Sequence, residues 1–187
     1  MFLFVFLLQA NYTTFSENIA KDGGAIYTST ETTMTINKAT FQGNTAKADG
    51  GGLYVKGALV TITETTFNEN HAQGTSARGN GGGIYADKGN KLLSITNTNF
   101  SKNTAKLGGG AVCSNMPTTI RYGSFEFNTA ENSSGGAIAI DGGCTLEINK
   151  AEFSGNRASV NGGAIYAPGH AKSLIITSTT FSKNTAS

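Results

Sequence analysis

A six-residue pattern, Phe-x-x-Asn-x-Ala, occurs seven times along this chain of 187 residues and constrains its fold more than any other feature. Successive motif phenylalanines are 26, 26, 33, 25, 28 and 28 residues apart. Such a period is typical of arrays whose units stack, because one short unit cannot bury its apolar face alone. We therefore expect one repeated unit. The motif pairs are Phe15 and Asn18, Phe41 and Asn44, Phe67 and Asn70, Phe100 and Asn103, Phe125 and Asn128, Phe153 and Asn156, and Phe181 and Asn184.

Between successive motifs lies a glycine doublet that is followed by a small residue and then an aliphatic one, first as Gly23-Gly24-Ala25-Ile26. A glycine-rich loop that cradles phosphate occurs once per nucleotide site and opens a helix. Six copies without a helical pattern behind them indicate a structural turn instead. The long step of 33 residues contains an insertion, residues 73–80, made of loop-type residues. The other doublets are Gly50 and Gly51, Gly81 and Gly82, Gly109 and Gly110, Gly135 and Gly136, and Gly162 and Gly163.

The residues before each motif phenylalanine alternate between apolar and polar, which predicts a β-strand with one buried face. An isoleucine stands five residues before six of the phenylalanines, and the position seven residues before lies on the same face of the strand. Before Phe153, for example, these two positions hold Ile148 and Leu146. The segment after the glycine doublet is a second short strand, entered through a turn that a Cβ would forbid. Phe-x-x-Asn is the third piece, and its asparagine suits a left-handed corner.

These pieces predict an all-β fold, a right-handed parallel β-helix (β-solenoid) with about 27 residues and three short strands per coil, in six to seven coils. Each strand would lie parallel to its counterpart one repeat later, and parallel crossovers are right-handed. The phenylalanines, isoleucines and asparagines would then form interior columns. Stacked asparagine side chains can satisfy one another's amide groups along such a column.

The domain organisation follows from where the repeats begin. Residues 1–10 have two interpretations: the hydrophobic part of a secretion signal, or an N-terminal strand in which Leu8 and Ala10 begin the first coil. Residues 11–187 form the β-helix repeat domain. The sequence stops in mid-coil without a further glycine doublet, so we expect a fragment that is open at its C-terminal end. Self-association through the solenoid ends is a further expectation.

Composition narrows the possible partners. Only 14% of the residues are charged and the net charge is +2, so no nucleic-acid partner is predicted. The two cysteines, Cys113 and Cys144, fall five residues apart once the coils are aligned, which favours thiols over a disulfide. The tyrosines after the doublets suggest either an aromatic column or ordinary packing; they are Tyr27, Tyr54, Tyr85 and Tyr166.

The alternation of Gly-Gly-Ala-aliphatic and Phe-x-x-Asn motifs resembles the polymorphic membrane proteins of chlamydiae over residues 11–187. The resemblance implies a β-helical autotransporter passenger on the outer membrane or cell surface that acts as an adhesin. Its partner would be a host cell-surface receptor or glycan, or the extracellular matrix. The resemblance also implies that the motif residues named above are associated with adhesion. Three doublet segments depart from the consensus, and no translocator barrel follows.

The alternative class is a carbohydrate-active β-helix enzyme, a polysaccharide lyase or hydrolase, because fold alone does not settle function. Such enzymes need carboxylates that converge on one face. The acidic residues Glu64, Glu147 and Glu152 stand at different positions relative to their motif phenylalanine. We therefore predict a protein that is not an enzyme and has no catalytic residues. An ice-binding threonine face is a third class, but Arg121 and Glu147 interrupt that array.

Other polar residues predict no cofactor and no metal. Asp22 and Asp49 share the position before the doublet, where a turn-forming role is expected. His71 and His170 have no Cys, His or carboxylate companion at ligand spacing in the sequence. For specific contacts we expect three loops, since loops on a rigid scaffold carry function. They are residues 73–80, 86–91 and 168–172.

Overall fold

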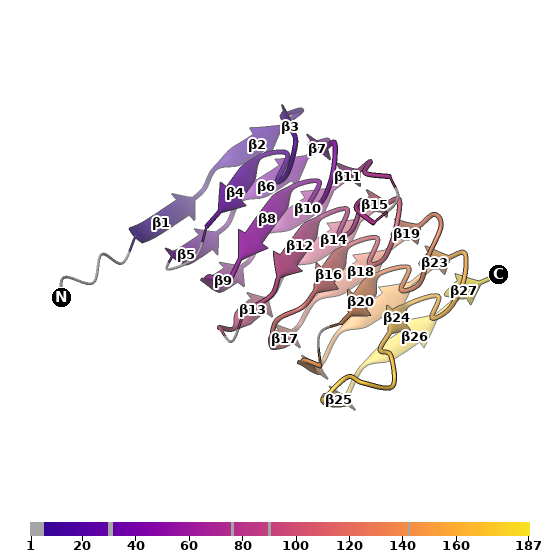
Figure 1. The fold of residues 1–187 in the computed structure, drawn as a ribbon. Coiled ribbons are helices and arrows are strands. Elements are labelled where there is room, and N and C mark those ends of the chain that lie inside the picture. The colour runs from indigo at the N-terminus through magenta and orange to yellow at the C-terminus, as the bar shows by residue number, and fades with distance from the viewer. Residues whose placement is uncertain (1–5, 30–31, 76, 90, 142) are drawn as a thin grey trace.

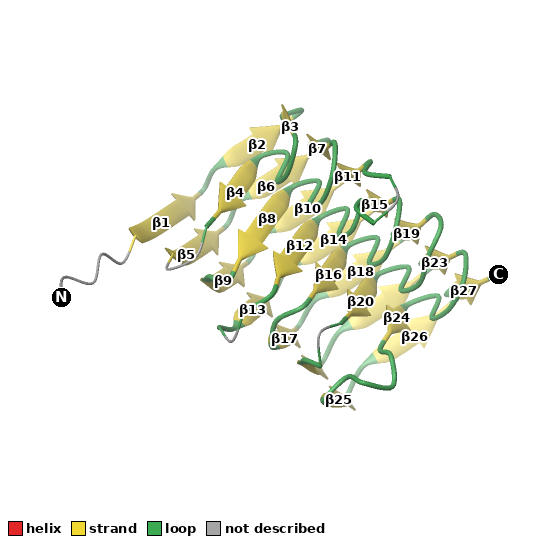
Figure 2. Cartoon of the chain, in the orientation of Figure 1, coloured by secondary structure: helices red, strands yellow, loops and turns green. Residues whose placement is uncertain are grey.

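The coils stack along one axis from the N-terminal to the C-terminal end (Figure 1). The computed structural model describes residues 6–29, 32–75, 77–89, 91–141 and 143–187. Within these ranges every regular element is a short strand, and none is a helix (Figure 2). The strands form four sheets, and each strand pairs in parallel with the equivalent strand one coil away. The predicted all-β parallel solenoid is confirmed.

The isoleucine sheet contains the alternating strands that precede each motif phenylalanine. Ile36, Ile62, Ile95 and Ile120 face inward and are fully buried. In its first strand Leu8 lies opposite Met34. The position of the first coil is therefore as predicted from the repeat, and residues 1–5 lie outside the described part. The strands are β1 (Phe6–Asn11), β5 (Thr32–Asn37), β9 (Leu59–Thr63), β13 (Leu93–Thr96), β17 (Thr118–Arg121), β21 (Thr145–Asn149) and β25 (Ser173–Thr177).

The phenylalanine sheet holds the aromatic column. Neighbouring rings stack with centroids 4.5 to 4.9 Å apart, a spacing that follows from the distance between paired strands. The five central rings are fully buried. The strands are β2 (Thr14–Ser16), β6 (Thr40–Gln42), β10 (Thr66–Asn68), β14 (Asn99–Ser101), β18 (Ser124–Glu126), β22 (Glu152–Ser154) and β26 (Thr180–Ser182).

The alanine sheet follows directly, so the expected third piece is two strands and each complete coil has four strands instead of three. The left-handed corner between these strands lies one residue before the motif asparagine, as at Lys102 with φ 52°. The prediction that asparagine takes this corner is therefore wrong. The strands are β3 (Ile19–Ala20), β7 (Thr45–Ala46), β11 (His71–Ala72), β15 (Thr104–Ala105), β19 (Thr129–Ala130), β23 (Arg157–Ala158) and β27 (Thr185–Ala186).

The motif asparagines point inward and form the predicted ladder. The amide nitrogen of Asn103 donates to Asn128 Oδ1 at 3.0 Å and to the Phe67 carbonyl at 2.9 Å. Its Oδ1 accepts from the backbone N–H and the Nδ2 of Asn70, at 3.0 and 2.9 Å. Both amide hydrogens and the carbonyl oxygen are thus satisfied without water, which lets a polar side chain sit fully buried.

The tyrosine sheet is entered through the glycine doublets. Gly109 has φ +69°, a left-handed conformation that suits glycine. A Cβ on Gly110 would lie 2.2 Å from the carbonyl oxygen of Gly136 in the next coil, so close stacking excludes a side chain there. The strands are β4 (Ile26–Thr28), β8 (Leu53–Lys56), β12 (Ile84–Asp87), β16 (Val112–Ser114), β20 (Ile138–Ile140) and β24 (Ile165–Tyr166).

Candidate functional site

The outer face of the tyrosine sheet is recessed below its surroundings. Cys113 and Ala139 occupy outward-facing positions of their strands, yet each exposes only 6% of its surface. By contrast, Thr61 and Glu147 at outward positions of the isoleucine sheet are exposed. The difference arises because side chains and loops on both borders of the tyrosine sheet stand above its middle.

A groove of about 220 Å³ lies in this recess, and we call it the tyrosine-sheet groove. Its floor includes Cys113 and Ala139. Gly108 contributes to one wall, where a Cβ would lie 3.2 Å from the Cβ of Ala139. The other side is bordered by the segment after β20 and the loop after β24. The remaining lining residues are Asn80, Leu107, Ser133, Ser134, Ile140, Asp141, Tyr166, Pro168 and His170.

The groove interrupts a row of tyrosines. Tyr27 stacks on Tyr54 with ring centroids 5.0 Å apart, and Tyr54 is 5.2 Å from Tyr85 with the rings tilted by 55°. The next two aligned positions carry Cys113 and Ala139, and the row resumes at Tyr166. The suggested aromatic column therefore forms over three coils. The groove occupies the place of two rings that the sequence does not supply.

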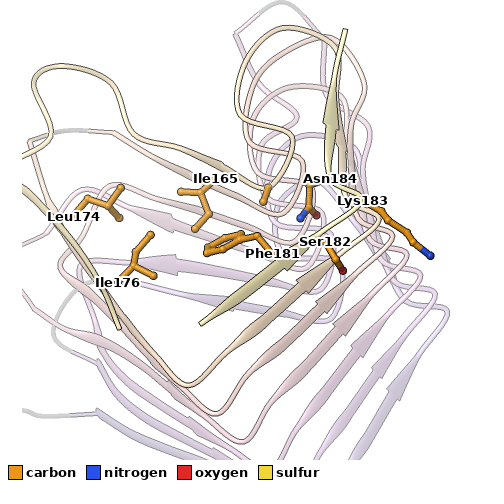
Figure 3. Close-up of a pocket in the computed structure, with 8 residues that line it drawn as sticks. Ile165, Leu174, Ile176, Phe181, Ser182, Lys183 and Asn184 are labelled. Atoms are coloured by element: carbon orange, nitrogen blue, oxygen red, sulfur yellow. The ribbon is translucent and has the colours of Figure 1, made fainter. Parts of the chain in front are cut away.

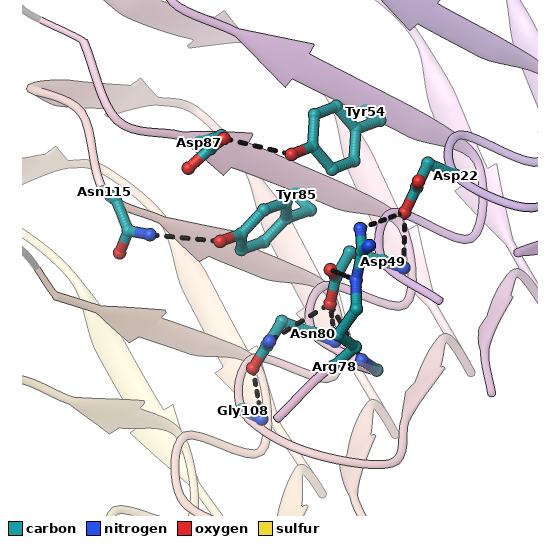
Figure 4. A network of polar contacts seen from close by, with 10 residues as sticks. Asp22, Asp49, Tyr54, Arg78, Asn80, Tyr85, Asp87, Gly108 and Asn115 are labelled. Carbon is teal, nitrogen blue, oxygen red and sulfur yellow. Dashed lines mark hydrogen bonds and ion pairs between the residues drawn. The ribbon is translucent and has the colours of Figure 1, made fainter. Parts of the chain in front are cut away.

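The hydroxyls of two tyrosines are paired with residues of the next coil (Figure 4). Tyr54 donates to Asp87 Oδ2 at 3.0 Å, and the Tyr85 oxygen accepts from Asn115 Nδ2 at 3.2 Å. Burial raises the pKa of Tyr54, and its hydrogen bond to Asp87 raises it further. The pKa of Tyr85 is raised mainly by burial as well. Both phenols are therefore protonated donors or acceptors at neutral pH.

The insertion, residues 73–80, is fastened to the upstream border of the tyrosine sheet (Figure 4). Asp49 Oδ2 accepts from Arg78 Nε at 2.8 Å, and Arg78 also pairs with Asp22. Asp49 Oδ1 accepts from the N–H groups of Gly79 at 2.7 Å and Asn80 at 2.9 Å. The expected turn-forming role of the two aspartates is wrong, because their acceptors serve residues of neighbouring coils.

A protein-family model described as "Right handed beta helix region" matches residues 4–186 of the chain. The chain belongs to the right-handed β-helix family. The predicted handedness is thereby confirmed. The described part of this β-helix contains no helix with the length and hydropathy that crossing a bilayer requires.

One curated relative is a protein of Dictyostelium discoideum named "Metabotropic glutamate receptor-like protein R". It is 34% identical to the β-helix over 97 residues. The match covers 51% of this chain and 6% of the relative, so the two proteins share only a small part of the relative's length. No solved structure matches the chain significantly.

The downstream border of the groove in this β-helix carries a histidine–aspartate contact that sequence spacing did not indicate. His170 Nε2 lies 2.6 Å from Asp141 Oδ1, although the two residues are 29 positions apart. The prediction that His170 lacks a carboxylate companion is therefore wrong, because stacking brings successive coils together. His71 lies in β11 on the alanine sheet. The residues that the structure describes include no cluster of three or more His, Cys, Asp or Glu suited to a metal.

The three loops expected to carry contacts all border the tyrosine sheet. Residues 73–80 lie on its upstream side through Arg78, while 86–91 and 168–172 continue from the ends of β12 and β24. Ser76 and Asn90 lie outside the described residues. The five central motif asparagines and the five central phenylalanines are buried, so their side chains contact the core and not solvent, whereas Asn18 at the N-terminal end is exposed. The groove was missed in the sequence, although the break in the tyrosine row at Cys113 and Ala139 was a usable signal.

The C-terminal coil of the β-helix leaves part of the core uncovered, as expected for a solenoid end (Figure 3). Leu174, Ile176 and Phe181 are 43, 38 and 45% exposed, whereas their counterparts in the preceding coil are buried. They line an open cavity of about 470 Å³ together with Ile165 and Asn184. These side chains continue the interior columns of the preceding coil.

Because of Cys113, the free energy of unfolding should fall as the pH becomes alkaline. Burial, with smaller effects of Asp49 and Asp141, raises the pKa of its thiol from 9.0 to about 12. The folded chain keeps this proton above pH 9, where the unfolded chain loses it. The stabilisation is therefore complete below about pH 9 and is lost as pH rises towards 12, by up to about 1.4 kcal/mol per pH unit.

We expect Cys113→Ala to remove this part of the alkaline loss, because Ala139 occupies the equivalent position one coil later. The measurement is the free energy of unfolding by urea between pH 7 and 11 for both proteins. The alkaline slope should be shallower in the variant, and parallel curves would contradict the assignment. The remaining slope belongs to groups such as Tyr54 and Tyr85, whose pKa values are also raised.

Proposed function

We propose that this β-helix is a non-catalytic adhesin passenger, displayed at the cell surface or outer membrane or secreted. It attaches to a host cell-surface receptor or glycan, or to extracellular matrix. The observation that carries the proposal is the tyrosine-sheet groove with loops on both borders, since rigid scaffolds present binding residues in this way. Self-association through the solenoid ends is a second mode of contact under the same proposal.

Two similarities support placement at a surface. The repeated motifs resemble those of chlamydial polymorphic membrane proteins, and that family's passengers are adhesins. The Dictyostelium relative is named as receptor-like, and its matched segment is 34% identical to this chain.

The non-catalytic part of the proposal is supported by how the acidic groups near the tyrosine sheet are engaged. Asp49 is 4% exposed and accepts four hydrogen bonds from the insertion, while Asp87 accepts from Tyr54. An acid–base pair for glycosidic cleavage needs two carboxyl groups that flank a substrate. These carboxylates are instead committed to holding loops and side chains.

The test uses beads coated with purified protein and cultured host cells or immobilised matrix. We expect saturable attachment by the wild type. The matched control scrambles residues 73–80 except Gly74, Arg78, Gly79 and Asn80. Gly74 is kept because a Cβ there would lie 2.6 Å from the Gly79 nitrogen, so the contacts of the insertion with Asp49 are retained. Attachment no stronger than that of albumin-coated beads would defeat the proposal. Depolymerisation of a polyuronide panel by the wild type would revive the enzyme alternative.

A further inference from the structure

Two tyrosines of the row, Tyr54 and Tyr85, follow one rule. The hydroxyl of each pairs with the residue that stands two positions after the aligned residue of the next coil. Tyr54 aligns with Tyr85 and bonds Asp87; Tyr85 aligns with Cys113 and bonds Asn115. The rule follows from stacking, because a ring lying flat over its strand directs its hydroxyl towards the downstream border.

The same rule predicts an acceptor at the first interrupted position. Cys113 aligns with Ala139, and the residue two positions later is Asp141. A phenol placed over Cys113 would therefore direct its hydroxyl towards this carboxylate, as Tyr54 does towards Asp87. The contact between Asp141 and His170 is compatible with this bond, because a carboxylate accepts several hydrogen bonds. The following position has Pro168 instead, which offers no side-chain acceptor.

We propose that the tyrosine-sheet groove binds a tyrosine side chain of a protein partner, with the ring over Cys113 beside Tyr85 and the hydroxyl donating to Asp141. This deepens the proposed adhesin function, on which it rests, by assigning a protein contact to the groove. The bound ring would continue the row at the spacing of Tyr27, Tyr54 and Tyr85, where centroids are 5.0 and 5.2 Å apart. Aromatic pairs at such distances attract beyond the burial of their area.

The floor of the groove favours the face of a phenol over that of a sugar ring. The thiol of Cys113 and the methyl of Ala139 form the floor, with Leu107 beside them, and these groups offer a ring face no strong hydrogen-bond partner. A sugar would bury hydroxyl groups against that floor, and an unpaired buried hydroxyl costs free energy. A tyrosine brings one hydroxyl, on the edge that meets Asp141. A volume of about 220 Å³ also suits a single ring and not an extended ligand.

The direct experiment titrates p-cresol, the isolated tyrosine side chain, into the wild-type protein and follows backbone amide NMR shifts. We expect saturable shifts of Gly108, Ser134 and Ala139, with a dissociation constant of about 1 mM, as suits a ligand of this size. Toluene, which lacks the hydroxyl, should bind roughly tenfold more weakly, because a hydrogen bond to a charged acceptor is lost.

Two variants separate the contribution of the aromatic ring to binding from that of the hydroxyl. Cys113→Tyr fills the first interrupted position with the residue found in four other coils and should abolish binding of both probes. Asp141→Ala should weaken the binding of p-cresol to the affinity of toluene and should leave the affinity for toluene unchanged. The proposal is overturned if p-cresol gives no saturable shifts, if it binds Cys113→Tyr as well as the wild type, or if Asp141→Ala has no effect. It is also overturned if methyl α-glucoside shifts these amides and p-cresol does not.

Bead attachment then separates this inference from the adhesin proposal. Loss of attachment by Cys113→Tyr, with an unchanged urea midpoint, supports the groove as the contact. Full attachment by that variant overturns the groove assignment and leaves the adhesin proposal standing. Self-association of the wild type that Cys113→Tyr abolishes would assign the groove to a second copy of the chain and overturn the partner proposed here.

Discussion

Replacing Phe100 by alanine should lower the free energy of unfolding by about 3–5 kcal/mol. Its ring is fully buried and stacks on Phe67 and Phe125, with centroids 4.9 and 4.8 Å away. The stacked strands are held at a fixed spacing by backbone pairing, so the neighbouring coils cannot collapse into the space that the ring leaves. The loss therefore includes apolar burial, both stacking contacts and a residual cavity.

Urea unfolding followed by circular dichroism measures this loss as a shift of the midpoint, on the order of 2 M for a protein with an ordinary denaturant slope. Phe127→Ala is the matched control, because the same side chain is removed from a site that is 59% exposed. That variant should change stability by no more than about 0.5 kcal/mol. Equal effects of the two substitutions would show that the aromatic column is not the core of the solenoid.

Replacing Asn103 by leucine should cost about 4 kcal/mol or more, although the two side chains have similar shapes. The change removes both donors to Phe67 and Asn128 and both bonds that Asn103 Oδ1 accepts from Asn70. Each buried group that is left without a partner costs roughly 1–3 kcal/mol. Apolar burial of the leucine offsets only part of that sum.

The same urea measurement tests this prediction, with Asn149→Leu as the control. Asn149 faces outward in β21, and its amide nitrogen donates to Thr177 Oγ1 at 2.9 Å at an exposed position. We expect a change within about 0.5 kcal/mol for the control. A loss below 1 kcal/mol in Asn103→Leu would mean that the asparagine ladder adds little to stability.

The interior of the coil was predictable residue by residue. Phe100, Asn103 and Ile95 recur at fixed offsets in other repeats, and a stacked repeat places equal positions directly over one another. The corners were less predictable. Lys102 and its equivalents take the left-handed conformation instead of the asparagines, since the asparagine side chain is needed inside and its neighbour absorbs the turn.

The candidate site was not predictable from the same pattern, because it consists of departures from it. The groove lies where Cys113 and Ala139 stand in place of tyrosine, and its borders include Asn80 of the insertion and Pro168 and His170 of the loop after β24. Arg78 reaches Asp22, 56 positions earlier, and His170 reaches Asp141, 29 positions earlier. Spacing along the chain carries no information about such contacts until the number of residues in each coil is known.

The sequence by itself determined the architecture of this protein: a parallel β-helix with phenylalanine and asparagine columns inside and glycine doublets at the turn. It could do so because the same residues recur in the same order in every coil and must meet when the coils stack. Only the tertiary structure decided that each complete coil has four strands, that the tyrosine face is recessed, and that the insertion is fastened beside it. Those features depend on how loops of different length fold back across neighbouring coils, and the repeat does not encode that.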